Sequence, residues 1–389
     1  MYGSKTFIIV AFFLVARHAM GQEEMNSAMV ERKSYQLYVD KKWDELIPYG
    51  RNAIQEGYDY FYLRLRLGIA LYEKGQFRVA ATHFEKALRF NSGDELTLEY
   101  LYFSLIFSDR FDEARKLSET FGDALSAKIG QKARSPIAFI SAEGGLKMSS
   151  RNDLFNPAFY FQLGVGHTVG NKFSVYHAAT VYTQNESRGD ISQFQYFIQP
   201  SIPVGRHWTL TPSVHIVSVN FQKTNGLLQS TGMVGSLSLA KSCPYFDISI
   251  GGTVSNVLTS LQYIQQSRLA IYPSGKPNFS FGVISYLHSE DDFLTSTLAI
   301  NPFVYWRPVR KVGFYANYFM NKYENIAEMN GYLVNNSPDL TLSRTSALLS
   351  LEVNRHWQVY TVYQFENKQE FNSIAYSYNV FLIGLKFKP

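Results

Sequence analysis

The chain has 389 residues, of which 46% are hydrophobic and 18% are charged, so it is long enough for two or three domains with buried cores. Aromatic residues make up 16% of it, although the mean hydropathy is only -0.15. Beyond the N-terminus no apolar run reaches the roughly 18 residues of a membrane-spanning helix. The net charge of +5 comes without the dense Lys/Arg block typical of nucleic-acid binding. The composition therefore excludes a helical membrane protein, and we expect no nucleic acid as partner.

The first 21 residues have the layout of a secretory signal peptide. Lys5 supplies the positive start, residues 7–15 form a short apolar stretch, and Ala19-Met20-Gly21 is a small-x-small cleavage site. The alternative, a membrane anchor, is disfavoured because nine apolar residues are too few to cross about 30 Å of hydrocarbon. We therefore expect residues 1–21 to be a signal peptide.

A helical repeat block is predicted over residues 25–134, where apolar residues recur at helical spacing. The block matches itself with a period of 34 residues. The clearest copy begins near Phe61 and carries Leu67, Gly68, Leu71, Gly75, Phe77, Ala80, Phe84 and Ala87. These positions resemble the signature of the tetratricopeptide repeat. The resemblance implies about three stacked helix pairs, in which Gly68 and Ala80 let the two helices of one repeat approach closely.

The repeat resemblance also implies a concave surface lined by exposed residues of each first helix. The candidate partner-binding residues there are Tyr62, Ile69, Tyr72, Phe103 and Ile106. If they are exposed, they form an apolar groove for a peptide or a partner helix. The alternative is that they only pack between repeats.

A barrel is predicted over residues 137–389, because apolar and polar side chains alternate there with a period of two. Six short connections are predicted at residues 170–172, 204–207, 242–244, 274–277, 308–311 and 354–356. They alternate with seven more polar connections near residues 150, 187, 224, 258, 290, 330 and 370, which we expect to be surface loops. These thirteen connections give fourteen strands, an even number as in bacterial outer-membrane barrels.

Aromatic residues near the short turns favour a membrane barrel over a water-soluble sandwich, which would show the same alternation. Trp208, Trp306 and Trp357 lie within a residue or two of a turn, as in the girdle at a bilayer interface. The last strand carries Phe387 two residues before the end, similar to the signal that outer-membrane assembly machinery reads. The predicted fold class is therefore an N-terminal α-solenoid followed by a transmembrane antiparallel β-barrel of about 14 strands, with outer-membrane lipid and that machinery as partners.

Alternation places five charged residues on the lumen side: Asp247, Arg268, Arg344, Glu352 and Lys386. They are candidates for gating or selecting solutes, or alternatively for bracing the wall as pairs. Fourteen strands lie between the eight that leave room only for side chains and the 16 to 18 that leave a channel, so a narrow pore and a plugged interior both fit.

Few residues in the sequence suggest a catalytic or metal-binding site. His288 and Asp291 lie in an acidic loop and have the side chains of a general base or of cation ligands at a barrel rim. No nucleophile with an oxyanion partner accompanies them, so a solvated loop is favoured and we expect no enzyme. Cys243 is the only cysteine and has no metal-ligand spacing around it, so we expect no disulfide, metal or cofactor.

The whole mature chain resembles outer-membrane proteins that join tetratricopeptide repeats to a barrel, above all the YaiO-type family with the layout found in Bacteroidetes. The resemblance transfers no functional residue. It implies an outer-membrane protein of a Gram-negative bacterium whose periplasmic repeats dock an unidentified protein. The leading hypothesis is help in the export or assembly of a surface polymer such as a polysaccharide. The alternatives are a non-conducting anchor for a periplasmic scaffold and a rim hydrolase.

Overall fold

The structure, a computed structural model, describes residues 26–130, 136–187, 189–223, 226–257, 261–290, 296–324, 326–334, 339–370 and 374–389. The predicted signal peptide of residues 1–21 lies outside these residues, as do residue 25 and residues 131–134 of the predicted repeat block. Among the described residues, no helix is long and apolar enough to cross a membrane.

The described part of the chain before residue 131 is helical. Its elements are α2 (Ser27–Val39), α3 (Trp43–Gln55), α4 (Phe61–Glu73), α5 (Phe77–Phe90), α6 (Glu95–Phe107), α7 (Phe111–Leu117), the 3-10 turn η1 (Ser118–Thr120) and α8 (Asp123–Ile129). The first residues of α2, α4 and α6 are 27, 61 and 95, and those of α3, α5 and α7 are 43, 77 and 111. Both series advance by 34 residues, so the period seen in the sequence is the period of the helix pairs.

Small residues set the spacing between these helices. A Cβ atom built on Gly68 of α4 would lie 2.4 Å from Cε1 of Phe84 on α5, and one built on Gly50 would lie 2.7 Å from Cδ2 of Leu67. Phe84 and Ala80 are fully buried at the α4–α5 contact. The helices therefore pack at a distance that only a residue without a side chain allows at position 68.

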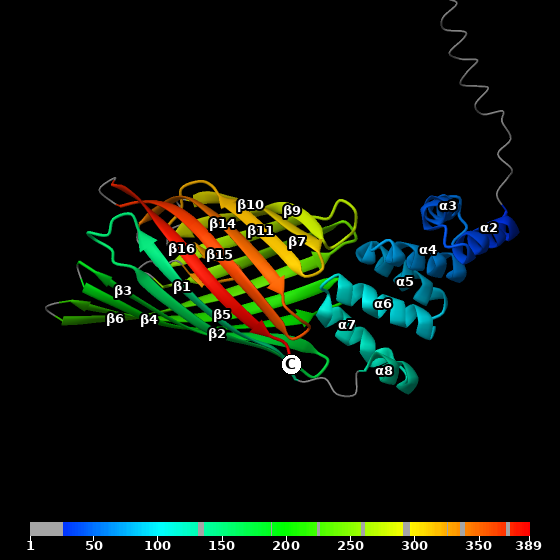
Figure 1. The fold of residues 1–389 in the computed structure, drawn as a ribbon, viewed down its shortest axis with the longest axis horizontal. Coiled ribbons are helices and arrows are strands. Elements are labelled where there is room, and N and C mark those ends of the chain that lie inside the picture. The colour runs from blue at the N-terminus through cyan, green and yellow to red at the C-terminus, as the bar shows by residue number, and fades with distance from the viewer. Residues whose placement is uncertain are drawn as a thin grey trace, which may run out of the picture.

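Fourteen antiparallel strands close into a barrel beyond the helices (Figure 1). They are β1 (Ile137–Ser149), β2 (Ala158–Val169), β3 (Phe173–Glu186), β4 (Gly189–Pro203), β5 (Trp208–Lys223), β6 (Gly226–Ser242), β7 (Phe246–Ser255), β8 (Gln262–Ile271), β9 (Phe279–Glu290), β10 (Ser296–Val309), β11 (Val312–Phe319), β14 (Leu340–Glu352), β15 (Trp357–Gln369) and β16 (Ala375–Phe387). Neighbours in sequence pair with each other, and β1 pairs with β16 to close the wall. The predicted fold class, including the strand count, is confirmed.

All six short connections fall between strands as predicted, after β2, β4, β6, β8, β10 and β14. Because strands alternate in direction, these six turns share one end of the barrel with the start of β1 and the end of β16. The helices lie beyond this turn end, and the C-terminus lies there too (Figure 1). The seven other connections share the opposite end, here called the loop end.

The outer wall is apolar. Exposed apolar side chains alternate along the strands and include Phe159, Phe161, Leu163, Ile248, Ile250, Leu349, Leu351, Ile383 and Leu385. Trp208, Trp306 and Trp357 are exposed beside the turn end. A wall of this kind, apolar outside and flanked by aromatic residues, is typical of a transmembrane barrel.

Replacing Gly68 by valine should destabilise the helical part by about 2 kcal/mol, because the new side chain overlaps the buried ring of Phe84. Thermal loss of the far-ultraviolet helical signal, recorded on the full-length protein, would occur at a lower temperature. The matched control is Gly93→Val, since nothing lies within 4 Å of a Cβ at Gly93. Equal stability of the two variants would contradict the close packing at position 68.

Candidate functional site

A buried arginine joins the helical part to the barrel. Arg78 on α5 is 3% exposed, and its Nη2 donates a 2.6 Å hydrogen bond to the carbonyl oxygen of Cys243 in the turn before β7. Its guanidinium also forms an ion pair with Asp247 on β7, and its Cζ lies 3.9 Å from the ring centre of Tyr272. The Tyr272 hydroxyl donates to the other Asp247 oxygen at 2.9 Å. One side chain thus holds α5 against β7 and the end of β8.

A second set of contacts comes from the first turn of α7. Oδ2 of Asp112 accepts hydrogen bonds from the hydroxyls of Ser174 on β3 and Ser201 on β4, at 3.1 and 2.7 Å. Oε2 of Glu113 accepts a 3.0 Å bond from the backbone N–H of His207, in the turn before β5. Two neighbouring carboxylates therefore bind the turn ends of three strands. The junction is polar and specific, as expected for an interface within one chain.

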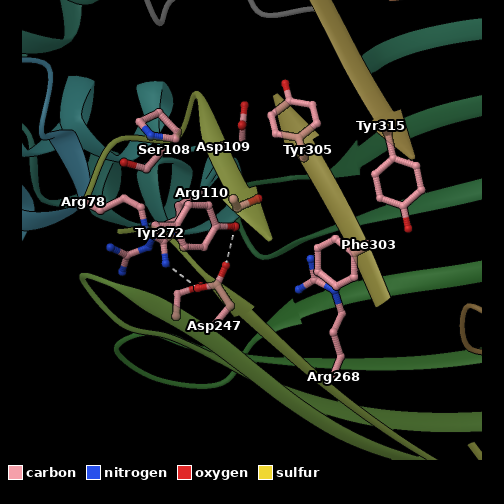
Figure 2. Close-up of a pocket in the computed structure, with 13 residues that line it drawn as sticks. Arg78, Ser108, Asp109, Arg110, Asp247, Arg268, Tyr272, Phe303, Tyr305 and Tyr315 are labelled. Atoms are coloured by element: carbon pink, nitrogen blue, oxygen red, sulfur yellow. Dashed lines mark hydrogen bonds and ion pairs between the residues drawn. The ribbon is translucent and has the colours of Figure 1, made fainter. Parts of the chain in front are cut away.

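A cavity of about 320 Å³, which we call the vestibule, lies between the helices and the lumen. Its lining includes Arg78, Asp109, Asp247, Arg268, Tyr272 and Phe303. Figure 2 shows the linked Arg78, Asp247 and Tyr272 on one side and Arg268 beneath the Phe303 ring on the other. The surrounding protein raises the pKa of the Asp109 carboxyl, because it replaces water around the charge. The volume is within the range of small-molecule sites.

The predicted lumen charges lie on strand positions that alternate with exposed apolar residues, so they face inward. Three of them have charged partners. Asp247 binds Arg78, as described above. Nη2 of Arg344 pairs with Oε2 of Glu328 at 2.5 Å, with both side chains buried, and Nζ of Lys388 lies 3.7 Å from Oε1 of Glu352. These three charges are engaged in ion pairs within the protein.

The other two predicted lumen charges contact aromatic rings. Cζ of Arg268 lies 4.9 Å from the ring centre of Phe303, and Nζ of Lys386 lies 3.6 Å from that of Phe139. Among the described residues, neither cation has a carboxylate within ion-pair distance. Of the two, Arg268 lines the vestibule, where it contacts an aromatic ring and no carboxylate among the described residues.

The connection between β11 and β14 folds into the barrel and crosses the lumen. Its residues 326–334, here called the plug, hold a short hairpin of β12 (Ala327–Glu328) and β13 (Leu333–Val334). The Tyr332 hydroxyl donates a 2.5 Å hydrogen bond to Gln162 on β2, and Nδ1 of His215 on β5 lies 2.8 Å from the carbonyl oxygen of Gly331. Together with the Glu328–Arg344 pair, these contacts tie the plug to β2, β5 and β14. The plug therefore reaches from one wall of the lumen to the other.

The prediction of a surface loop near residue 330 is wrong, because the loop has an apolar and a charged partner inside the barrel. Ile326 and Ala327 are buried in a cluster with Phe319 and Tyr286. Glu328 reaches the inward-facing Arg344. Both contacts remove surface from water that an extended loop would expose.

Only one of the predicted groove residues is exposed. Tyr62 is 57% exposed, whereas Ile69 is 4% exposed and packs in the cluster shared by α4, α5 and α6. The expectation that Ile69 lines an accessible groove is therefore wrong, because the next repeat covers this face of α4. Tyr72, Phe103 and Ile106 are partly buried against the same cluster. Their expected contact with a partner stays a prediction.

The residues proposed for rim chemistry do not form a site among the described residues. His288 is buried, with its Nε2 3.9 Å from Oε1 of Glu290. Asp291 lies outside the described residues. Within the described ranges, no three His, Cys, Asp or Glu side chains come together as metal ligands.

Sequence reasoning missed Arg78, Asp112, Glu113 and the inward role of Glu328. Their partners lie on other elements, so no local motif marks them. A weak signal existed for Arg78, since no acidic residue lies three or four positions from it to pair along the helix. A charged residue on a repeat helix without such a neighbour is a candidate for a contact with another domain.

Comparisons with known proteins return fold similarity alone. No family model and no curated protein matches the chain. The solved "CymD monoaromatic hydrocarbon channel" matches at 10% identity and a TM-score of 0.46, over 66% of this chain and 90% of that chain. The toluene transporter TbuX of Ralstonia pickettii matches at 9% identity and a TM-score of 0.43, over the same shares. The resemblance to the YaiO-type family is not confirmed by these comparisons.

Replacing Arg78 by methionine should loosen the junction, because it leaves Asp247 without its ionic partner, a loss of about 3–5 kcal/mol for a buried pair. The single thiol of Cys243 reports on this turn without engineering. Its maleimide labelling rate in the full-length protein should rise at least about tenfold. The matched control is Arg51→Met, because Arg51 is exposed and its hydrogen bond to Tyr245 in the same turn is long, at 3.4 Å. Equal labelling rates in both variants would show that Arg78 does not hold the junction.

Proposed function

We propose that the chain is an outer-membrane barrel, closed by its own plug, that anchors a periplasmic repeat domain for docking a partner protein. The apolar outer wall and the tryptophans beside the turn end support the membrane location. The short turns fit the periplasmic side, and the helices lie at that end (Figure 1). This orientation also gives the assembly machinery access to the last strand, β16, from the periplasm.

The anchoring role rests on one observation, which is that the plug occupies the lumen. A 14-stranded wall is wider than one that side chains alone can fill. The plug occupies the interior with a buried ion pair, hydrogen bonds to β2 and β5, and an apolar cluster. A lumen filled in this way favours a role of the barrel as a membrane anchor over a role as a channel for a polymer.

The repeat domain offers an exposed aromatic site for the partner. Tyr35 and Tyr62 are exposed on neighbouring helices, and Cζ of Arg66 lies 5.2 and 5.6 Å from their ring centres. Arg66 is held from behind by Glu31, with an Nη2–Oε1 distance of 2.6 Å. Exposed tyrosines are typical of the residues that dominate protein interfaces, and here the buried Arg66 lies beside both rings. The proposed partner is a periplasmic protein.

A second candidate function is a gated exporter of a surface polymer such as a polysaccharide. It is favoured by the form of the plug, which is a loop of the barrel itself and can leave the lumen without unfolding the wall. Inward hydroxyl and amide groups, such as Gln162 and Ser213, would then be freed from the plug to face the polymer. Rim hydrolysis has no such support, because His288 is buried and Asp291 lies outside the described residues.

Planar-bilayer conductance of the full-length protein separates the two candidates. The anchor hypothesis expects the wild type to stay closed. Glu328→Gln should produce openings, because it leaves Arg344 buried without its counter-charge at a cost of about 3–5 kcal/mol. Deletion of residues 326–334 should give a stably open pore. The control Glu324→Gln alters an exposed carboxylate beside the plug and should stay closed.

Frequent spontaneous openings of the wild type would instead support the exporter. A barrel that stays closed even without residues 326–334 would contradict the plugging role itself.

Partner docking is testable with a photo-crosslinking residue placed at Tyr62 in cells. We expect a discrete adduct there, which Tyr35→Ala reduces severalfold, because the two rings share Arg66. The same crosslinker at Phe90, which is exposed at the end of α5, is the control for nonspecific capture. An identical adduct pattern at positions 62 and 90 would contradict docking at Tyr62.

A further inference from the structure

The vestibule contains a cation whose hydrogen-bonding capacity is unused. Arg268, on β8, faces inward and touches the ring of Phe303 on β10. Among the described residues, no carboxylate lies within ion-pair distance of it, and no hydrogen bond from its guanidinium is found. A guanidinium carries five N–H donors. In a chamber with protein walls, these donors are left for a ligand or for water.

The contact with Phe303 leaves the guanidinium of Arg268 suited to bind an anion. The Phe303 ring, 4.9 Å from Cζ, offers no oxygen or nitrogen acceptor, so the N–H groups of the guanidinium keep their hydrogen-bonding capacity. A planar carboxylate or a phosphate binds to the edge of a guanidinium through two parallel hydrogen bonds.

The two other arginines at the vestibule are already paired with carboxylates. Arg78 pairs with Asp247, and Arg110 pairs with Glu113 at 2.5 Å. Asp109 lies near the cations Arg307, Lys388 and Arg78, but burial outweighs them and raises the pKa of its carboxyl. Asp109 also lies across the chamber from Arg268, beside Tyr305 (Figure 2). Among the described residues, Arg268 is therefore the arginine of the vestibule that has no carboxylate at ion-pair distance.

The remaining lining fits an organic body. The rings of Phe303, Tyr305 and Tyr315 line the same chamber as Arg268. Aromatic faces of this kind pack against apolar rings and against the C–H faces of sugars, and tyrosine adds a hydroxyl at its edge. The volume of about 320 Å³ accommodates a small molecule of that type.

We propose that the vestibule binds a small organic anion, whose carboxylate or phosphate pairs with Arg268 while its body packs against Phe303, Tyr305 and Tyr315. The site is separate from the docking surface at Tyr62 and from the plug. It does not depend on whether the barrel conducts, so a failure of the anchor hypothesis in the conductance experiment would leave this proposal standing.

Calorimetric titration of the full-length protein in detergent tests the site with three probes: benzoate, glucuronate and inorganic phosphate. We expect at least one of them to bind with a Kd of about 1 mM or tighter. Arg268→Gln should weaken that probe at least about tenfold, because a charge-assisted bidentate contact is lost. Arg268→Lys should bind the probe with an affinity between those of the wild type and Arg268→Gln, since lysine keeps the charge but not the planar guanidinium.

The matched control is Arg310→Gln, which removes the same charge from an exposed turn position at the same end of the barrel. It should bind like the wild type. Heat-modifiable migration on gels shows whether each variant barrel is folded, so loss of binding in a folded Arg268→Gln barrel supports the site. Absence of binding for all three probes, or equal binding by the Arg268 and Arg310 variants, would overturn the proposal.

Discussion

The width of a 14-stranded wall is the constraint on which the rest of the structure depends. Eight strands enclose an interior that their own side chains fill, and fourteen enclose more than that. The chain occupies this additional lumen volume from two directions. The plug enters between β11 and β14, and helices α5 and α7 cover the turn end through Arg78, Asp112 and Glu113. The vestibule lies where these helices meet the barrel wall, and its lining comes from both.

Buried charge explains why the plug has one defined position. The desolvation of Glu328 and Arg344 roughly offsets their mutual attraction, so the pair adds little net stability. Either charge alone in the lumen is strongly unfavourable, and this penalty excludes arrangements in which the plug slides along the wall. The apolar contacts of Ile326 and Ala327 provide the favourable free energy, and the ion pair determines where they form.

Local periodicity explains what could be predicted. The 34-residue repeat and the two-residue alternation repeat along the chain itself, so the helices, the strands and all six short turns follow from neighbouring residues. The plug and the junction could not be predicted in the same way. Arg78 and Asp247 are 169 positions apart, and Tyr332 and Gln162 are 170 apart. Pairing over such distances depends on barrel closure and on how the helices meet the turn end, which one sequence does not encode in any local pattern.

The junction and the vestibule share residues, and this has a thermodynamic consequence. Arg78, Asp247 and Tyr272 hold α5 to the barrel and also form one side of the chamber that contains Arg268. An anion at Arg268 would add negative charge near Arg78 and favour the docked position of that cation. Docking here means the contact of α5 with the barrel through Arg78. By linkage, a ligand that binds the docked state more tightly than the undocked state stabilises docking by the difference between its two binding free energies.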